Sequence, residues 1–241
     1  MDIWRDWLKN FYLKVKDDKR FTEIPEISDK VAVIIEPRSH ELFQYVLYNF
    51  MWFLQPKGWA LQIFHGTDNK SFVEEITKDM GYITKTGLPY SNLTEPIYNM
   101  LLTQSGFYKS IVGKPKHILI FQTDCILFSG ELERFLGYDM IGAKWKHSLT
   151  KGCNGGLSLR NRLSMIRVCE NNPWVYDNED GFFSYRYGDQ LNMPSEFEKD
   201  RFSVETCFNL YSCGTHKLYA HHDTEKVSEL LEKRWRDIFR K

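Results

Sequence analysis

The sequence lacks an excess of charge of either sign. Its 241 residues include 32 lysines and arginines and 32 aspartates and glutamates, so the formal net charge at pH 7 is zero. A protein whose main task is to hold nucleic acid or an anionic membrane needs a positive field at its surface. The composition therefore argues against a dedicated nucleic-acid binder.

Cysteine is scarce, and its spacing carries no metal or disulfide signature. The five cysteines are scattered singly and form no CxxC pair: Cys125, Cys153, Cys169, Cys207 and Cys213. Neither a zinc knuckle nor a disulfide framework follows from such a pattern. We expect the protein to work in a reducing compartment.

Long hydrophobic runs are also missing. No apolar stretch reaches the roughly 18 residues that a membrane-spanning helix needs, and the first twenty residues contain no small-residue cleavage site. We therefore expect no transmembrane segment and a soluble, cytoplasmic protein. The sequence contains no GxSxG, GxGxxG or GK[ST] motif either, which disfavours serine hydrolases, dinucleotide-dependent dehydrogenases and P-loop enzymes.

What the sequence has is apolar material, 42% hydrophobic and 15% aromatic, enough for one sizeable core. Short apolar runs alternate with segments of helical periodicity. The predicted strands are 31–35, 59–64, 117–121, 140–144 and 155–159, and the predicted helices are 4–15, 42–53, 72–80, 94–101, 162–169, 197–202 and 227–239. Two capping boxes, Ser71 with Glu74 and Ser195 with Glu198, mark helix starts. This order predicts one α/β, Rossmann-like domain with a mostly parallel central sheet flanked by helices.

Parallel sheets bind ligands beyond the carboxyl ends of their strands. Polar residues follow predicted strands at 36–38 and 122–124, and a double glycine, Gly155 and Gly156, opens the strand at 155–159. Glycine at these positions would let a ligand approach the backbone closely. A simple turn before the strand is the alternative explanation of the two glycines. Ser158 and Arg160 are the outward positions of the strand.

Asp124 lies between two apolar runs, where an ionised carboxylate needs a metal, an arginine or backbone donors as its partner. It would otherwise be a turn residue that caps local N–H groups. Histidines late in the chain, at His216, His221 and His222, are candidates to complete a metal site with it. A structural, hydrogen-bonded role is the alternative for each histidine.

Two adjacent carboxylates, Glu179 and Asp180, precede an aromatic run. Crowding and burial raise the pKa of one member of such a pair toward a value useful for a general base. Two adjacent acidic residues are also typical of a helix N-terminus, where the helix dipole favours negative charge. The two interpretations are compatible.

Taken in order, seven segments resemble one family: VAVIIEPR, FQTDCILF, IGAKW, CNGGLSLRN, NEDGFFS, FSVET and GTHK. They resemble the glycosyltransferase-like proteins of the DUF5672 family, which are similar in pattern to nucleotide-sugar-dependent transferases of the GT-A fold. The resemblance runs from Val31 to His222. It implies a GT-A-like domain over 29–222, preceded by an amphipathic helix and connector (1–28) and followed by a helix packed on the domain (223–241).

The resemblance further implies a glycosyltransferase that moves a hexose or pentose from a UDP- or GDP-sugar to a hydroxyl of a glycan or another acceptor. Asp124 matches the last position of the DxD motif and would hold a divalent metal, Mn or Mg, together with His216. Gln122 replaces the first Asp of that motif and supplies no charge. Asp180 matches the base of inverting enzymes, with Glu179 as the second choice and as a neighbour that orients the acceptor.

The remaining site residues implied by the resemblance bind the donor. Gly155 and Gly156 would line the sugar, and Arg160 would either neutralise phosphate or hold its strand. The other members of the expected donor site are Glu36, Arg38, Gln122, Thr123 and Asp124. Two alternatives stay open: a catalytically silent GT-A-like protein that binds sugar or a partner, and a metal-dependent phosphohydrolase built from Asp124, Glu179, Asp180 and His216.

Overall fold

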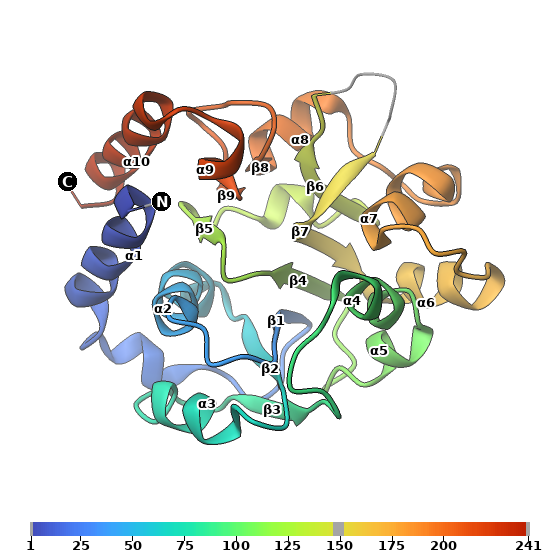
Figure 1. Ribbon diagram of the computed structural model, residues 1–241, viewed down its shortest axis with the longest axis horizontal. Helices are drawn as coiled ribbons and strands as arrows, with labels where there is room; N and C mark the ends of the chain where they lie inside the picture. Colours follow the sequence, from blue (N-terminus) through green and yellow to red (C-terminus); the bar gives the residue numbers. More distant parts are fainter. Residues whose placement is uncertain (1, 147–151, 240–241) are drawn as a thin grey trace.

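A six-stranded sheet runs through the centre of the protein in the order β3-β2-β1-β4-β7-β6 (Figure 1). The computed structural model describes residues 2–146 and 152–239. The strands are β1 (Lys30–Glu36), β2 (Ala60–His65), β3 (Thr84–Gly87), β4 (His117–Phe121), β6 (Met140–Lys144) and β7 (Cys153–Asn161). Met1 and residues 240–241, which the predicted terminal segments include, lie outside the described residues.

The sheet is mostly parallel, as predicted. β1 pairs in parallel with both β2 and β4, β2 pairs in parallel with β3, and β7 alone runs antiparallel to its neighbours β4 and β6. Every residue of β2 and β4 is buried, and all but the first residue of β1 are buried. A strand covered on both faces cannot alternate polar and apolar residues, which explains the continuous apolar runs in the sequence.

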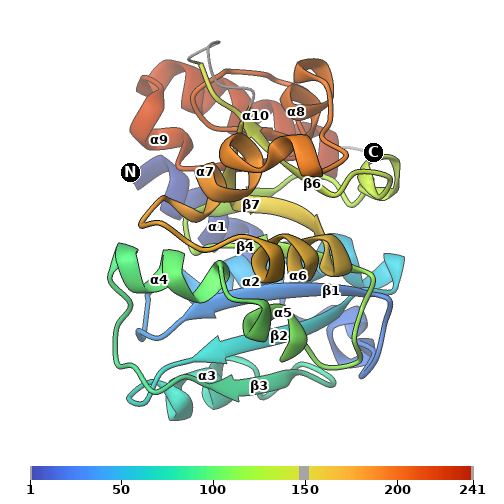
Figure 2. The ribbon, with the colours of Figure 1, turned by 90° about the vertical axis from the view of Figure 1, so that its right-hand side faces the viewer.

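Helices cover both faces of the sheet (Figure 2). One hydrophobic core lies between the sheet and α1 (Asp2–Val15), α2 (Phe43–Leu54), α3 (Lys70–Ile76) and α10 (Thr224–Phe239). The other core lies between the opposite face and α4 (Glu95–Leu102), α5 (Ser105–Lys109), α6 (Arg162–Asn171) and the π-helical turn η4 (Phe182–Arg186). The short helices are η1 (Lys19–Glu23), η2 (Gln55–Lys57), η3 (Glu133–Phe135), α7 (Glu179–Gly181), η5 (Gly188–Gln190), α8 (Glu196–Phe202) and α9 (Leu218–His221).

A second, three-stranded sheet has the order β5-β9-β8 and comprises β5 (Cys125–Leu127), β8 (Ser203–Val204) and β9 (Gly214–His216). β5 pairs antiparallel with β9, so that Cys125 stands opposite His216. β8 pairs in parallel with β9, with Val204 opposite Thr215. This small sheet brings residues nearly a hundred positions apart to the end of β4.

The sequence prediction contains none of the three strands of the small sheet, and two further details differ from it. β3 was not expected, because its residues alternate between exposed and half-buried and carry no apolar run. The capping box at Ser71 is also wrong, since α3 already begins at Lys70, after Asn69. The amide of Asn69 instead donates to the carbonyls of Glu36 and Arg38 and so holds the loop after β1. At the second box the predicted helix start is confirmed, because the Ser195 hydroxyl accepts from the Glu198 N–H, whereas the Glu198 carboxylate accepts from Arg134.

The terminal helices α1 and α10 lie side by side (Figure 1). The Trp7 indole donates to the Leu231 carbonyl at 3.0 Å. Trp4, Leu8 and Phe11 are fully buried, which places the apolar stripe of α1 in the protein's own core. Within the described ranges, no helix combines the length and the apolar character needed to cross a bilayer.

Candidate functional site

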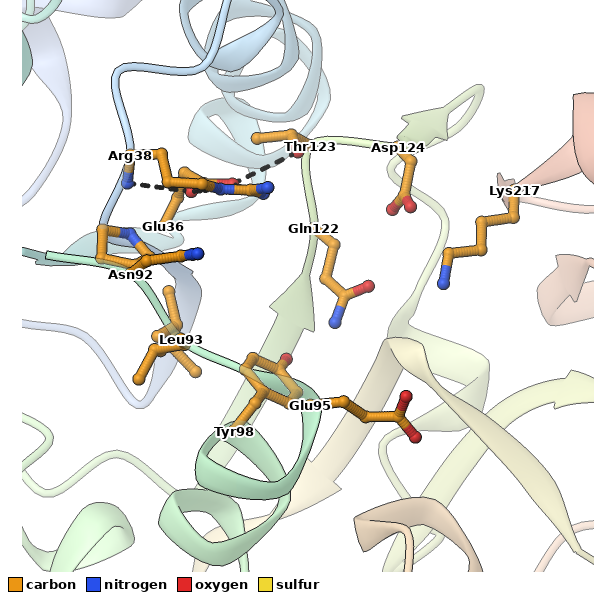
Figure 3. A pocket seen from close by; sticks show the side chains of 12 residues that line it. Glu36, Arg38, Asn92, Leu93, Glu95, Tyr98, Gln122, Thr123, Asp124 and Lys217 are labelled. Atoms are coloured by element: carbon orange, nitrogen blue, oxygen red, sulfur yellow. Dashed lines mark hydrogen bonds and ion pairs between the residues drawn. The ribbon is translucent and has the colours of Figure 1, made fainter. Parts of the chain in front are cut away.

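The carboxyl ends of β1 and β4 form a crevice at the centre of the sheet. From β1 the chain passes through α2 to β2 on one side of β1, whereas it returns from β3 through α4 and α5 to β4 on the other side, so the strand order reverses between β1 and β4. Ligands of open α/β sheets bind at such a switch point. A cavity of about 320 Å³ lies there (Figure 3), lined by Ile35, Glu36, Pro37, Arg38, Asn92, Leu93, Glu95, Tyr98, Gln122, Thr123, Asp124 and Lys217.

Glu36 and Arg38 form one wall of the cavity. The Arg38 guanidinium donates to both carboxylate oxygens of Glu36 at 2.8 Å, and the Arg38 N–H adds a third bond at 3.0 Å. The hydroxyl of Thr123, from the end of β4, lies 3.5 Å from Glu36. The charge of Arg38 is therefore largely compensated by its own neighbour, and the pair is a preorganised polar wall rather than a free cation.

Asp124 and His216 meet because of the pairing between β5 and β9. The register that sets Cys125 opposite His216 brings the imidazole beside Asp124, with Nε2 3.4 Å from the Asp124 Oδ1 and 3.1 Å from the Gln122 Oε1. Burial acts to raise the pKa of Asp124, but the neighbouring His216 and Lys217 outweigh it, so that the pKa is lowered. Asp124 is thus ionised at neutral pH.

Glu205 lies behind His216. It follows β8, and its Oε1 lies 3.0 Å from the Nδ1 of the imidazole. Burial disfavours the charged imidazole, yet the carboxylates of Asp124 and Glu205 outweigh burial and raise the pKa of His216 to about 8. With Nδ1 held by a carboxylate, the other nitrogen, Nε2, is the one presented toward Asp124 and Gln122.

Gly155 and Gly156 are required by close approaches on the floor of the site. A Cβ atom at Gly156 would lie 2.4 Å from the Nε2 of His216, and one at Gly155 would lie 1.8 Å from the Oε1 of Glu179. Real Cβ atoms do not come so near to other heavy atoms. The two glycines therefore let His216 approach β7 at Gly156 and Glu179 approach it at the adjacent Gly155.

Arg160 and Glu179 form a buried ion pair on the α7 side. The side chain of Arg160 is 0% exposed, and its Nη2 lies 2.8 Å from the Glu179 Oε2. The same guanidinium donates to Ser158, to the Tyr108 hydroxyl and to the Gly155 carbonyl. Of the two roles expected for Arg160, phosphate binding and holding its strand, the contacts favour the second, because every nitrogen of its guanidinium is engaged with Glu179 or with groups of the protein around its own strand.

Asp180 follows Glu179 at the start of α7, where the helix N-terminus favours acidic residues. Its Oδ2 accepts from the Gly155 N–H at 3.3 Å, and its backbone carbonyl accepts from the Ser184 hydroxyl at 2.6 Å. Burial and then the negative charge of Glu179 raise the pKa of Asp180 to about 7. A carboxyl group in this state can accept a proton near neutral pH.

The donors beside Asp124 suit a divalent cation. The Asp124 Oδ1 is buried and, among the described residues, accepts no hydrogen bond. Asp124, Cys125 and His216 offer ligand atoms within 4.8 Å of one another. Burial and the charge of Asp124 raise the pKa of Cys125 well above its usual value, and its thiol donates to the Gly156 carbonyl. A carboxylate and a carboxylate-backed imidazole are thus the metal ligands on offer, with the Gln122 oxygen nearby.

Of the predicted donor and metal residues, Glu36, Arg38, Gln122, Thr123 and Asp124 line the cavity. His216 contacts Asp124 and Gln122 but is not on the cavity wall. The cavity wall also does not include Gly155, Gly156, Arg160, Glu179 or Asp180. His222, a fallback ligand, instead contacts the Glu205 carbonyl and the Phe208 ring. Sequence reasoning missed Tyr98, Lys217 and Glu205. FSVET and GTHK contain the last two, but only the pairing of β8 and β9 shows that they face the site.

Comparison with known proteins gives one family and partial structural likenesses. A model of the family described as "Protein of unknown function (DUF5672)" matches residues 89–219, more than half of the chain. No curated protein matches. The solved structure of residues 1–349 of TarS from S. aureus is similar over 56% of this chain and 48% of that one, with 12% identity and a TM-score of 0.39, so the chain spans about half of its length. HddC from Yersinia pseudotuberculosis is similar over 60% of this chain and 80% of that one, with 11% identity and a TM-score of 0.40.

Proposed function

The chain belongs to the DUF5672 family, and from its site we propose that it is a glycosyltransferase that moves a sugar from a nucleoside-diphosphate sugar to an acceptor hydroxyl. One observation carries the proposal. A carboxylate with a carboxylate-backed histidine and a carboxyl group of raised pKa lie at the two ends of the Gly155–Gly156 dipeptide. A ligand that needs charge compensation at one end and proton removal at the other fits that arrangement.

In the proposed reaction, Asp180 accepts the proton of the acceptor hydroxyl. The hydroxyl oxygen bonds to the anomeric carbon while the bond from that carbon to the β-phosphate oxygen breaks, which releases the nucleoside diphosphate. Glu179, the ion-pair partner of Arg160, lies next to Asp180, and its negative charge helps to raise the pKa of Asp180. Attack from the face opposite the leaving group would invert the anomeric configuration.

The donor would occupy the cavity at the ends of β1 and β4. Glu36 and Arg38 form its polar wall and Pro37 and Leu93 contribute apolar surface, which together suit a nucleoside. A divalent ion held by Asp124 and His216, Mn or Mg, would neutralise charge on the departing diphosphate. The nucleotide of the donor is UDP or GDP in this proposal, and the acceptor is a glycan or another hydroxyl compound.

A thermal-stability screen tests the donor site. UDP, GDP, CMP and their sugar conjugates are added with Mn or with EDTA to the wild type, to Asp124→Ala and to a control, Asp68→Ala, which changes an exposed carboxylate outside the cavity. We expect one nucleotide to raise the melting temperature of the wild type and of the control by several degrees and to leave Asp124→Ala unchanged. If no nucleotide shifts the wild type, the transferase proposal fails.

A silent sugar- or partner-binding protein of the same fold is the second candidate. Gln122 favours it, because an amide in place of the first Asp of the motif supplies no charge for a metal. Incubation of the donor selected by the screen with a mixture of glycan acceptors separates the two. Release of nucleoside diphosphate, with a new anomeric proton signal by NMR, supports the enzyme, and binding without release supports the silent protein.

A further inference from the structure

The cationic side chains in and near the cavity differ in whether a carboxylate already pairs with them. Arg38 is held by both oxygens of Glu36, and Arg160 is fully buried against Glu179. Lys217 lines the same cavity and is exposed. Among the residues that the structure describes, no carboxylate lies within ion-pair distance of its ammonium group. Figure 3 shows its side chain extending into the cavity beside Asp124 and Gln122.

The backbone of Lys217 has an unusual conformation. Its φ of +46° and ψ of 32° lie in the left-handed region, which costs a lysine on the order of 1 kcal/mol relative to glycine. The strained position is held by the Lys217 N–H, which donates to the Asp124 carbonyl at 3.1 Å. Glycine or asparagine would accept this backbone more readily, so the lysine side chain is retained at a cost in stability.

We propose that Lys217 binds the diphosphate of the donor and supplies positive charge there, next to a motif in which the uncharged Gln122 replaces the first Asp. The inference rests on the proposed function and adds to it a residue that contacts the leaving group. An ammonium on a flexible stem is a common phosphate ligand. When the glycosidic bond breaks, negative charge grows on the diphosphate oxygens, and Lys217 would stabilise that charge.

Binding of UDP, GDP and the corresponding nucleosides by calorimetry, in EDTA and in Mn, tests the proposal on the full chain. In Lys217→Gln we expect the affinity for the nucleoside diphosphate to fall about ten- to a hundredfold, the loss typical of one charged hydrogen bond. The affinity for the nucleoside, which has no phosphate, stays unchanged. Lys217→Arg retains most of the diphosphate affinity, and Lys9→Gln, an exposed lysine of α1, is the matched control.

Lys217→Gly separates a role in binding from a role in folding. The glycine relieves the left-handed strain, so we expect a melting temperature equal to or above that of the wild type together with the same loss of diphosphate affinity. If Lys217→Gln and Lys217→Gly bind the diphosphate as tightly as the wild type while Asp124→Ala does not, Lys217 has no such role and the donor site stands. If the wild type binds no nucleoside diphosphate in either buffer, this inference and the proposed function both fall.

Discussion

Two clusters of similar composition flank Gly155 and Gly156, and they behave differently. Each contains two carboxylates and one cationic side chain. The cluster on the small sheet contains Asp124, His216 and Glu205, and the cluster beside α7 contains Arg160, Glu179 and Asp180. The difference lies in the cation.

A guanidinium keeps its charge at every pH at which the protein is folded, whereas an imidazole gains or loses its charge near neutrality. Arg160 is fully buried and pairs with Glu179, and burial together with the negative charge of Glu179 raises the pKa of the second carboxyl group, Asp180, to about 7. On the other side, Asp124 lines the cavity and His216 lies beside Asp124, with ligand atoms that a cation would fit. In the proposed reaction, one cluster would be a fixed scaffold for proton transfer, and the other would be an adjustable binding site.

Removing the proton acceptor of the scaffold gives the largest expected effect. Asp180→Asn keeps the shape of the side chain but abolishes its basicity, so we expect the rate of sugar transfer to fall about 10²- to 10⁴-fold with little change in donor affinity. Initial rates and donor binding are measured on the same preparations. The neighbouring Asp177→Asn, which breaks only the exposed pair with Arg186, is the control. A rate for Asp180→Asn close to the wild type would remove Asp180 from the mechanism.

Removing the fixed cation tests the scaffold itself. Arg160→Met leaves the Glu179 carboxylate buried without its partner, and we expect the free energy of unfolding to drop by about 3–5 kcal/mol. Urea denaturation measures the change. Arg186→Met, at a half-exposed ion pair with Asp177, is expected to cost about 0–1 kcal/mol. Equal losses at the two arginines would contradict the distinction between a buried and an exposed pair.

The raised pKa of Asp180 predicts an unusual pH dependence of stability. The group binds its proton more tightly in the folded than in the unfolded state, so its contribution favours folding at low pH and is lost as the pH rises from about 4 toward 7. The loss is on the order of 4 kcal/mol. We expect Asp180→Asn to be more stable than the wild type at pH 8, with the difference shrinking toward pH 4. A difference that does not depend on pH would show that Asp180 has an ordinary pKa.

Removing the carboxylate that holds the His216 imidazole tests the cluster on the small sheet. Glu205→Gln leaves His216 without a carboxylate at Nδ1, and we expect the affinity for Mn to fall about ten- to a hundredfold. Calorimetric titration with Mn measures it, and Glu131→Gln, an exposed carboxylate paired with Lys57, should bind as the wild type does. Unchanged Mn affinity in Glu205→Gln would mean that His216 is not a ligand.

The smallest expected effect comes from filling the space between the clusters. Gly156→Ala forces its methyl group against the rigid imidazole of His216, and we expect a loss of about 1–3 kcal/mol in stability together with weaker Mn binding. Gly106→Ala, in α5 where a Cβ atom would meet nothing within 4 Å, is expected to be neutral or stabilising. Thermal melts of the two variants, compared directly, decide whether the close approach at Gly156 matters.

The sequence alone determined the fold class and the place of the site. Continuous apolar runs at β1, β2 and β4 predicted buried parallel strands, because a strand covered on both faces has no polar side. The sequence pattern did not predict β3, since an exposed edge strand has no such apolar run. The polar residues after β1 and β4 indicated the crevice, because parallel strands end at a common edge of the sheet.

Only the tertiary structure decided which side chains meet there and in what state. Arg160, an outward position in the sequence pattern, became a buried partner of Glu179, and Glu205 and Lys217 reached the site through pairings of β8, β9 and β5. A pKa depends on burial and on charges that are distant in sequence, so the contrast between Asp124 and Asp180 could not be derived from local patterns. Long-range strand register placed these charges, and that register is set by packing rather than by any single segment.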